Sequence, residues 1–312
     1  MRIGIIAHLK HPISEPFAGG LEAHTHLLAR GLRRKGHDVT VFASTRSDPS
    51  LGLEAICDET AIGEVGVAEA TDVTFFREHH AYLRLMTELG GRDFDVIHNN
   101  ALHYLPVAMA HAVASPMVTT LHTPPFCWLE SGVRLCRSSR STFVAVSHAV
   151  RRQWQPITPI EGVILNGIDL DSFAFRETPD EDPYLVWSGR IVPEKGLHLA
   201  MDAARLAGMP LRFAGPISNP AYFAAEIKPR LSADAVHLGH LSHGELARLI
   251  GGARALLFTP CWEEPYGLVA AESLACGTPV AAFARGAIAE VVDETCGVLA
   301  APDDAAALAS AA

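Results

Sequence analysis

The chain has 312 residues, of which 49% are hydrophobic, and its formal net charge is -10 at neutral pH. At roughly 150 residues per domain, this length predicts two domains, each large enough to bury its own core. The acidic balance argues against a general nucleic-acid-binding protein, because such proteins usually carry a basic surface.

Neither an export signal nor a membrane span is expected from the sequence. The apolar run after Met1 is too short for a signal-peptide core, and no stretch reaches the ~20 apolar residues of a spanning helix. The six cysteines form no C-x-x-C pair, and none of the 16 histidines falls in an H-E-x-x-H pattern. We therefore expect a cytoplasmic protein with free thiols and no bound metal.

The first half reads as strands that alternate with helices. Residues 2–7 form a short apolar run typical of a buried strand, and residues 21–35 carry leucines on one face of a 3.6-residue repeat before Gly36 ends the helix. Residues 46–92 fit neither pattern, and we expect an irregular, partly helical insertion there. Further strands are expected at residues 38–43, 95–98, 117–122, 143–147 and 162–165.

The second half repeats this alternation. Strands that alternate with helices predict a parallel sheet covered on both faces. We predict an α/β protein with two doubly wound, Rossmann-like parallel-sheet domains, residues 1–165 and 166–312, that face each other across a cleft at the carboxyl ends of the strands. The strands of the second half are expected at residues 184–188, 211–214, 236–238, 255–259 and 279–283, and its helices at residues 196–206, 242–251 and 268–276.

The most informative segment is residues 259–268, continuing to Glu272. Glu264 precedes a proline and should therefore lie in a loop, whereas Glu272 should lie about one turn into the next helix. The amino terminus of that helix, at Gly267 and Leu268 and directly after Tyr266, then lies between the two carboxylates and attracts phosphate. A carboxylate at Glu272 can accept hydrogen bonds from both hydroxyls of a ribose.

Two cations follow the first strand of the second half. Residues 187–196 run from strand to loop to helix, with Gly189 and Arg190 in the loop and Lys195 just before the helix. An arginine offers a bidentate fork for phosphate oxygens, and a lysine offers a point charge. Together, Arg190 and Lys195 could stabilise a diphosphate leaving group without a metal.

The first half contributes two smaller patterns. Gly19 and Gly20 begin a helix where a ligand can approach the backbone closely, although they form no G-x-G-x-x-G pattern. His122 lies at the carboxyl end of a predicted strand. Each pattern alone is more often turn chemistry, a solvated face or a hydrogen-bonded histidine, so the ordered co-occurrence of all of them favours a functional site.

Two further patterns have plainer explanations. Asp169 and Asp171 form a D-x-D that resembles a metal-binding motif, but it lies in the expected linker and not in a cleft. A basic run ends the first helix, where it complements the helix dipole; contact with a membrane surface is the sharper alternative. That run consists of Arg30, Arg33, Arg34 and Lys35.

Taken together, these segments resemble the family-four retaining glycosyltransferases of the GT-B fold, also called glycosyl transferases group 1. The likeness covers nearly the whole chain. It departs from the family at Tyr266, where phenylalanine is more usual, and at the carboxyl end, where family members usually continue beyond the helix that begins near Asp303. The matching stretches are residues 19–22, 143–147, 166–169, 188–190 with 195–196, and 264–268 with Glu272.

This resemblance implies a UDP-sugar or GDP-sugar donor seated mainly on the second domain. Arg190 and Lys195 would then contact the diphosphate, Glu272 the ribose and Glu264 the sugar hydroxyls. From the first domain, Gly20 and His122 would face the donor. Transfer with retained anomeric configuration, no cofactor and usually no metal are also implied.

The acceptor is left open between a saccharide, a lipid and a small molecule, with peripheral contact to the cytosolic face of a membrane as one option. Three alternatives to a transferase remain. They are a non-catalytic protein that binds a nucleotide sugar or a partner, a sugar-nucleotide epimerase, and a phosphorylase. A phosphorylase would need pyridoxal phosphate, for which no lysine context is evident.

Overall fold

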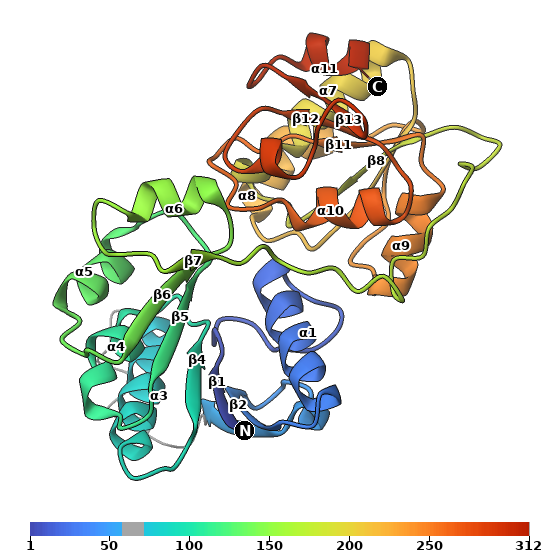
Figure 1. Cartoon of the computed structure of the whole chain (residues 1–312). Coiled ribbons are helices and arrows are strands. Elements are labelled where there is room, and N and C mark those ends of the chain that lie inside the picture. Colours follow the sequence, from blue (N-terminus) through green and yellow to red (C-terminus); the bar gives the residue numbers. More distant parts are fainter. Residues whose placement is uncertain (58–71, 312) are drawn as a thin grey trace. The chain divides into compact units, whose positions relative to one another are not determined.

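The computed structural model describes residues 1–57 and 72–311. The chain forms two compact units, Met1–Ile164 (unit 1) and Leu165–Ala312 (unit 2). Each unit is a parallel β-sheet covered by helices (Figure 1). The predicted α/β class with two Rossmann-like parallel sheets is therefore confirmed.

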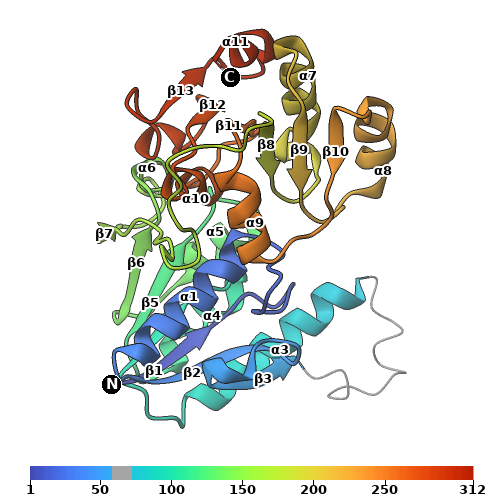
Figure 2. The ribbon, with the colours of Figure 1, turned by 90° about the vertical axis from the view of Figure 1, so that its right-hand side faces the viewer.

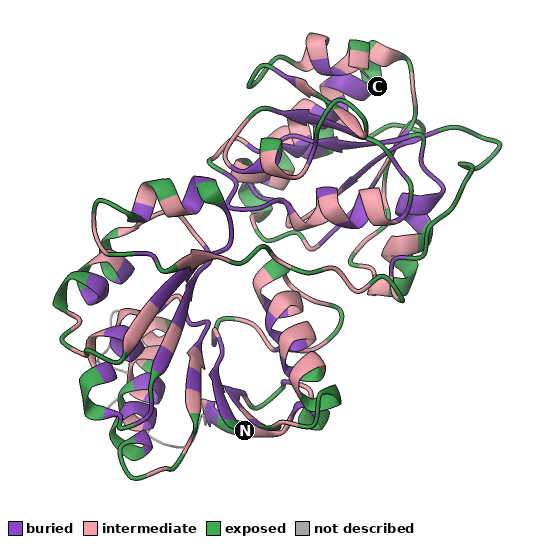
Figure 3. Ribbon diagram, viewed as in Figure 1, coloured by how far each residue is buried: buried purple, intermediate pink, exposed green. Residues whose placement is uncertain are grey.

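Unit 1 is built on a seven-stranded sheet with the order β3-β2-β1-β4-β5-β6-β7, in which every pair is parallel. The strands are largely buried (Figure 3) because helices cover both faces. They are β1 (Arg2–Ile6), β2 (Asp38–Ser44), β3 (Leu53–Cys57), β4 (Val96–Asn99), β5 (Met117–Leu121), β6 (Ser141–Ala145) and β7 (Gly162–Val163).

Alternate side chains of β1 explain the two layers of unit 1. Ile3 and Ile5 pack in one apolar cluster with Ala29 of α1, whereas Ile6 packs in a second cluster with Leu85 of α3. This period of two is what a strand buried on both faces requires. The helices are α1 (Gly20–Arg34), α3 (Val73–Leu89), α4 (Tyr104–Ala108), α5 (Cys127–Leu135) and α6 (His148–Trp154), with 3₁₀ turns at Pro49–Leu51 and Ala110–Ala112.

Unit 2 is built on a six-stranded parallel sheet with the order β10-β9-β8-β11-β12-β13. Figure 2 shows β8, β9 and β10 side by side. The strands are β8 (Leu185–Ser188), β9 (Leu211–Ala214), β10 (Ala235–His237), β11 (Ala255–Phe258), β12 (Val280–Phe283) and β13 (Gly297–Ala300).

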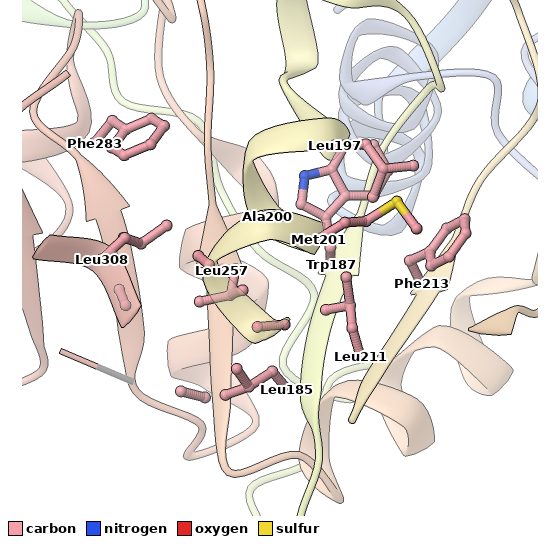
Figure 4. Packing of buried hydrophobic residues seen from close by; sticks show 14 of the residues in the cluster. Leu185, Trp187, Leu197, Ala200, Met201, Leu211, Phe213, Leu257, Phe283 and Leu308 are labelled. Atoms are coloured by element: carbon pink, nitrogen blue, oxygen red, sulfur yellow. The ribbon is translucent and has the colours of Figure 1, made fainter. Parts of the chain in front are cut away.

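The core of unit 2 has the same two layers. Leu185 and Trp187 of β8 pack on one face with Leu197 of α7 and Leu308 of α11 (Figure 4). Val186 packs in a second cluster on the other face. The helices are α7 (Leu197–Ala207), α8 (Pro220–Tyr222), α9 (His243–Gly251), α10 (Leu268–Ala275) and α11 (Ala305–Ala311), with a π-helical turn at Phe223–Ile227 and 3₁₀ turns at Pro193–Lys195, Lys228–Arg230 and Ile288–Glu290.

The segment at residues 46–92 was expected to be irregular and partly helical, and no strand was predicted there. This segment contains β3, which pairs in parallel with β2, and the long helix α3. Residues 58–71 of the segment lie outside the described residues. The strand β13 was not predicted either. Both missed strands form a sheet edge and pair on one side only. The apolar run of β3 is interrupted by Glu54, and β13 is an apolar run of only four residues.

Each sheet has a point where the strand order reverses. In unit 1, β1 lies between β2 and β4, and in unit 2, β8 lies between β9 and β11. Ligands of open α/β sheets bind outside the carboxyl ends of the strands at such a point. Ligand-binding residues are therefore expected in the loops after β1 and β4 of unit 1 and in the loops after β8 and β11 of unit 2.

Candidate functional site

An ion pair joins the two loops at the reversal point of unit 2. Lys195 ends the 3₁₀ turn that follows β8, and Glu264 lies in the loop that follows β11. The Lys195 Nζ atom lies 2.7 Å from Glu264 Oε2, and the two side chains are 22% and 10% exposed. The sequence placed both residues in one site, and the structure brings them into direct contact.

A close approach of backbone to backbone fixes Lys195. The next residue, Gly196, has a φ of 66° and caps the amino terminus of α7. A Cβ atom at Gly196 would overlap the carbonyl oxygen of Thr259, so only glycine fits. The Thr259 hydroxyl donates a hydrogen bond of 2.9 Å to the Gly196 carbonyl oxygen. The loop that carries Lys195 is thereby attached to the end of β11.

A second glycine fixes the backbone of Glu264. Gly286 has a φ of 63°, and a Cβ atom there would overlap backbone atoms of Glu264. The amide of Ala287 donates to the Glu264 carbonyl oxygen at 2.8 Å, and the amide of Gly286 donates to Glu263 Oε2 at 3.1 Å. The loop after β12 therefore holds the loop after β11, and the sequence analysis did not find this contact.

Trp262 holds the carboxylate of Glu264 from the other side. Its indole Nε1–H donates a hydrogen bond of 2.9 Å to Glu264 Oε2, the same oxygen that Lys195 contacts. The Lys195 ammonium also lies 5.2 Å from the centre of a Trp262 ring, within the range of a cation–π interaction. Trp262 was overlooked as a site residue, although it lies two positions before Glu264.

The amino terminus of α10 is open. Gly267, with a φ of 95°, is its N-cap and supplies no side-chain hydrogen bond, so the first amides, beginning at Leu268, are available to an anion. The preceding residue, Tyr266, is anchored by its hydroxyl, which donates to the Asn166 carbonyl oxygen at 3.0 Å.

Glu272 is a buried carboxyl group on the same helix. It is the fifth residue of α10 and is only 7% exposed. Burial raises the pKa of Glu272 to about 7. Its carboxyl group makes no hydrogen bond to any residue in the described ranges 1–57 and 72–311. A buried carboxyl group without a hydrogen-bond partner is suited to accept hydrogen bonds from a ligand.

Arg190 is a cation that the described part of the chain leaves without an ion pair or hydrogen bond. It follows Gly189, whose amide donates to the Ala214 carbonyl oxygen of β9 at 3.1 Å. A Cβ atom at Gly215 would overlap the carbonyl oxygen of Gly189, so the ends of β8 and β9 meet closely. This places the Arg190 backbone at the carboxyl edge of the sheet, as the sequence predicted.

In unit 1, the predicted residue His122 directly follows β5. Its Nε2 atom lies 2.8 Å from the Oδ1 atom of Asn100, which directly follows β4. His24 of α1 contacts the His122 ring edge-to-face, with 5.0 Å between ring centres. Burial, with the positive charge that nearby histidines would carry, holds the pKa of His122 well below its usual range. The imidazole is therefore neutral at neutral pH.

Gly19 and Gly20 lie at the start of α1, as predicted. Gly19 is the N-cap with extended backbone, and it offers no side-chain hydrogen bond to the first amides of the helix. The start of α1 follows β1, so it lies at the reversal point of the unit 1 sheet. The backbone amides there are open to an anion or an oxygen of a ligand.

The remaining patterns from the sequence can also be located in the structure. Asp169 accepts a hydrogen bond of 3.1 Å from the Ser172 hydroxyl, as in an ordinary turn. Within residues 1–57 and 72–311, no group of three or more histidine, cysteine, aspartate or glutamate residues is placed to hold a metal ion. None of the helices in those ranges is long and apolar enough to cross a membrane. The basic residues at the end of α1 are exposed.

Two family descriptions match the chain. Glycosyltransferase Family 4 matches residues 18–172, and Glycosyl transferases group 1 matches residues 170–312. Among curated proteins, the chain is 31% identical to glycogen synthase of Mycobacterium tuberculosis, with a match that covers 94% of this chain and 81% of that protein. It is 26% identical to the MMP alpha-(1->4)-mannosyltransferase of Mycolicibacterium hassiacum, over 97% of this chain and 86% of that protein.

Solved structures show the same fold. HepE of Anabaena, in a crystal structure with UDP and glucose, has a TM-score of 0.74 and 19% sequence identity, over 99% of this chain and 88% of that chain. These likenesses agree with the two parallel-sheet units described above. The chain therefore belongs to the glycosyltransferases of family 4 and group 1.

Proposed function

We propose that this glycosyltransferase binds the nucleoside diphosphate of a UDP-sugar or GDP-sugar on unit 2 and transfers the sugar to an acceptor hydroxyl with retention of configuration. One observation carries the proposal. The carboxyl edge of the unit 2 sheet combines two cations, an open helix amino terminus and a buried carboxyl group that has no hydrogen bond to the described residues. These are the groups that a diphosphate and a ribose require.

Each group has a part in this proposal. Arg190 offers a fork to the diphosphate oxygens, and Lys195 offers a point charge that a bound diphosphate shares with Glu264. The amides at Gly267 and Leu268 add hydrogen bonds to the same anion. Glu272 accepts hydrogen bonds from the ribose hydroxyls. These hydroxyls would supply the partners that the buried carboxyl group lacks among the described residues.

Catalysis is then electrostatic. Arg190 and Lys195 stabilise the diphosphate as it departs and as positive charge develops on the sugar. The acceptor hydroxyl attacks the sugar from the face that the diphosphate leaves, so that its oxygen replaces the diphosphate oxygen and its proton passes to the departing diphosphate, which retains the configuration. Glu264 lies beside Lys195 and is held by Trp262, so its carboxylate is positioned for the sugar hydroxyls. From unit 1, His122 and the amides after Gly19 are proposed to contact the donor.

A group of aromatic rings in unit 1 supports a saccharide acceptor. Trp128 is 54% exposed, and its ring contacts Phe75 and Tyr104, with 5.4 and 5.8 Å between ring centres. These rings lie at the starts of α5, α3 and α4, which follow parallel strands and therefore begin at one edge of the sheet. Exposed aromatic faces pack well against the C–H face of a pyranose ring.

The first experiment incubates the protein with UDP-glucose or GDP-mannose and measures free nucleotide. UDP-glucose is chosen because a structure of HepE holds it, and GDP-mannose because mannosyltransferases are among the relatives. Proton NMR of the product from an α-linked donor should show an α linkage; a β product would overturn retention. Turnover should survive excess EDTA, and loss that magnesium or manganese restores would overturn the assignment of the diphosphate charge to Arg190 and Lys195.

A non-catalytic role in binding nucleotide sugars is the alternative. It predicts binding by calorimetry without release of nucleotide for any donor. The presence of Arg190, Lys195, Glu264 and Glu272 at one sheet edge favours the enzyme, because a relative that no longer catalyses transfer would tend to lose some of these groups.

A further inference from the structure

Asn100 lies at the reversal point of the unit 1 sheet and was not found by the sequence analysis. It directly follows β4, and its backbone amide donates to the Ile6 carbonyl oxygen of β1 at 2.9 Å. Its side chain is completely buried. A fully buried amide side chain at the carboxyl edge of a sheet needs partners for both its oxygen and its nitrogen.

The oxygen of this amide determines the protonation of His122. Asn100 Oδ1 lies 2.8 Å from His122 Nε2. An amide oxygen can only accept a hydrogen bond, so Nε2 of the neutral imidazole must carry the proton. The other ring nitrogen, Nδ1, is then left as an acceptor, and it has no hydrogen bond to the described residues.

The nitrogen of the same amide finds no hydrogen-bond partner among residues 1–57 and 72–311. Asn100 Nδ2 is buried and makes no hydrogen bond within the described part of the chain, and the same holds for His24 Nε2 and Thr123 Oγ1. All three atoms belong to residues beside His122. Asn100 is hydrogen-bonded to the His122 ring, His24 contacts the same ring, and Thr123 follows His122 in the chain. An unmade buried hydrogen bond costs about 1–3 kcal/mol, so such a concentration indicates a polar ligand.

We infer that Asn100 is a positioning residue that fixes His122 as the Nε2–H tautomer, so that Nδ1 of His122 accepts a hydrogen bond from a sugar hydroxyl while the Asn100 amide donates to a sugar oxygen. The ligand part of this inference rests on the proposed function, because it takes the ligand to be a sugar. The tautomer part does not rest on it.

The decisive measurement is the imidazole nitrogen spectrum of the protein labelled with ¹⁵N-histidine. His122 should show the Nε2–H tautomer at neutral pH. Asn100→Leu, which keeps the size of the side chain, should abolish the single tautomer. Asn100→Asp should raise the pKa of His122, because a carboxylate then replaces the amide beside Nε2, and the other ionisable groups that face the ring, His8, His24 and His98, do not compensate.

A matched control exists on the same two strands. His98 Nε2 lies 2.7 Å from the Thr120 hydroxyl, an equivalent contact between β4 and β5. Thr120→Val should change the His98 signal and leave the His122 tautomer intact. The control separates a general loosening of these strands from the specific effect of Asn100.

Activity then tests the ligand part. Asn100→Leu should lower turnover of the sugar donor roughly tenfold, while nucleoside-diphosphate binding stays at the level of the parent. An Nδ1–H tautomer in the parent overturns the positioning role, whether or not the protein transfers sugar. The expected tautomer with unchanged turnover of Asn100→Leu overturns the sugar contact. Absence of turnover in the parent with the tautomer confirmed refutes the proposed function and the sugar contact together, and leaves the positioning role standing.

Discussion

The carboxyl edges of the two sheets differ in charge. In unit 2 the edge carries the ionisable residues Arg190, Lys195, Glu264 and Glu272. Two of them, Lys195 and Glu264, form an ion pair. In unit 1 the edge carries neutral groups, because burial keeps the pKa of His24 at about 4 and that of His122 well below its usual value. The same topology thus supports two chemistries: charged groups suit a diphosphate, and neutral donors and acceptors suit hydroxyl groups.

The largest effect is expected at the ion pair. Lys195→Ala should weaken nucleoside-diphosphate binding roughly ten- to a hundredfold, since a charge-assisted hydrogen bond contributes about 1.5–3 kcal/mol. Calorimetry with UDP and GDP measures this. Lys228→Ala is the matched control, because Lys228 is an exposed lysine of the same unit. Equal losses in both variants would mean that the edge acts only through general charge.

Glu272 should distinguish the nucleoside from the diphosphate. Glu272→Ala should weaken UDP or GDP about tenfold, yet leave inorganic diphosphate nearly unaffected, because only the nucleotide carries a ribose. Glu264→Gln should instead lower turnover more than nucleotide binding. If Glu272→Ala binds nucleotide as well as the parent does, the ribose role is refuted.

The two edges should respond to pH in opposite directions. The pKa of Glu272 is raised from 4.5 to about 7, so its contribution to stability is present below pH 4.5 and is lost as pH rises through 7. The pKa of His24 is lowered from 6.5 to about 4, so its contribution is present above pH 6.5 and is lost as pH falls toward 4. Amide hydrogen exchange, corrected for the pH dependence of the intrinsic exchange rates, measures the stability of each unit separately.

Two variants make this pH comparison specific. Glu272→Gln should remove the loss of protection in unit 2 between pH 4.5 and 7. His24→Gln should reduce the loss in unit 1 between pH 6.5 and 4, to which His98 and His103 also contribute because burial lowers their pKa to about 4 as well. Each variant should leave the other unit as it was. Parallel pH profiles in the two units would contradict the difference in charge.

A smaller effect is expected at the aromatic rings of unit 1. Trp128→Ala should raise the KM for a saccharide acceptor roughly three- to tenfold, as the loss of a ring contact worth about 0.5–1.5 kcal/mol predicts. Nucleotide affinity should not change. Leu135→Ala is the control, since Leu135 is an exposed apolar residue of the same helix. An equal rise in both variants would remove the argument for a saccharide.

The smallest effect is expected at Trp262. Trp262→Phe keeps an aromatic face for the Lys195 ammonium but removes the hydrogen bond to Glu264, which should lower turnover roughly two- to tenfold. Trp262→Ala removes both contacts and should lower it further. Nucleotide affinity should separate the two variants, because only the alanine removes the ring beside Lys195. Identical behaviour of both would show that the ring contributes nothing.

Most of the central strands and the charged site could be predicted from the sequence. Central strands of a parallel sheet are mostly apolar, and β8, β9, β11 and β12 were found within one residue at each end. Arg190, Lys195 and Glu264 were singled out because they follow predicted strands, and Glu272 because it lies about one turn into the helix that begins beside Glu264. The edge strands β7 and β10 were also predicted, whereas the edge strands β3 and β13 were not.

Asn100, Trp262 and Gly286 could not be predicted because their roles depend on contacts between separate loops. Asn100 meets His122 only because β4 and β5 are neighbours in the sheet, a register that the sequence does not state. Trp262 turns back onto Glu264 through the geometry of one loop. A polar residue near the carboxyl end of a predicted strand was a usable signal for Asn100, since His122 was chosen on that ground.

The glycine at position 286 has a consequence for engineering the enzyme. Because Gly286 and Ala287 hold the main chain of Glu264, the path of that loop does not depend on the side chain at position 262, whereas the side chain of Glu263 accepts a hydrogen bond from the Gly286 amide. A library that randomises position 262 should therefore yield many folded variants. Randomising position 286 should yield almost none, because any side chain there meets the backbone of Glu264.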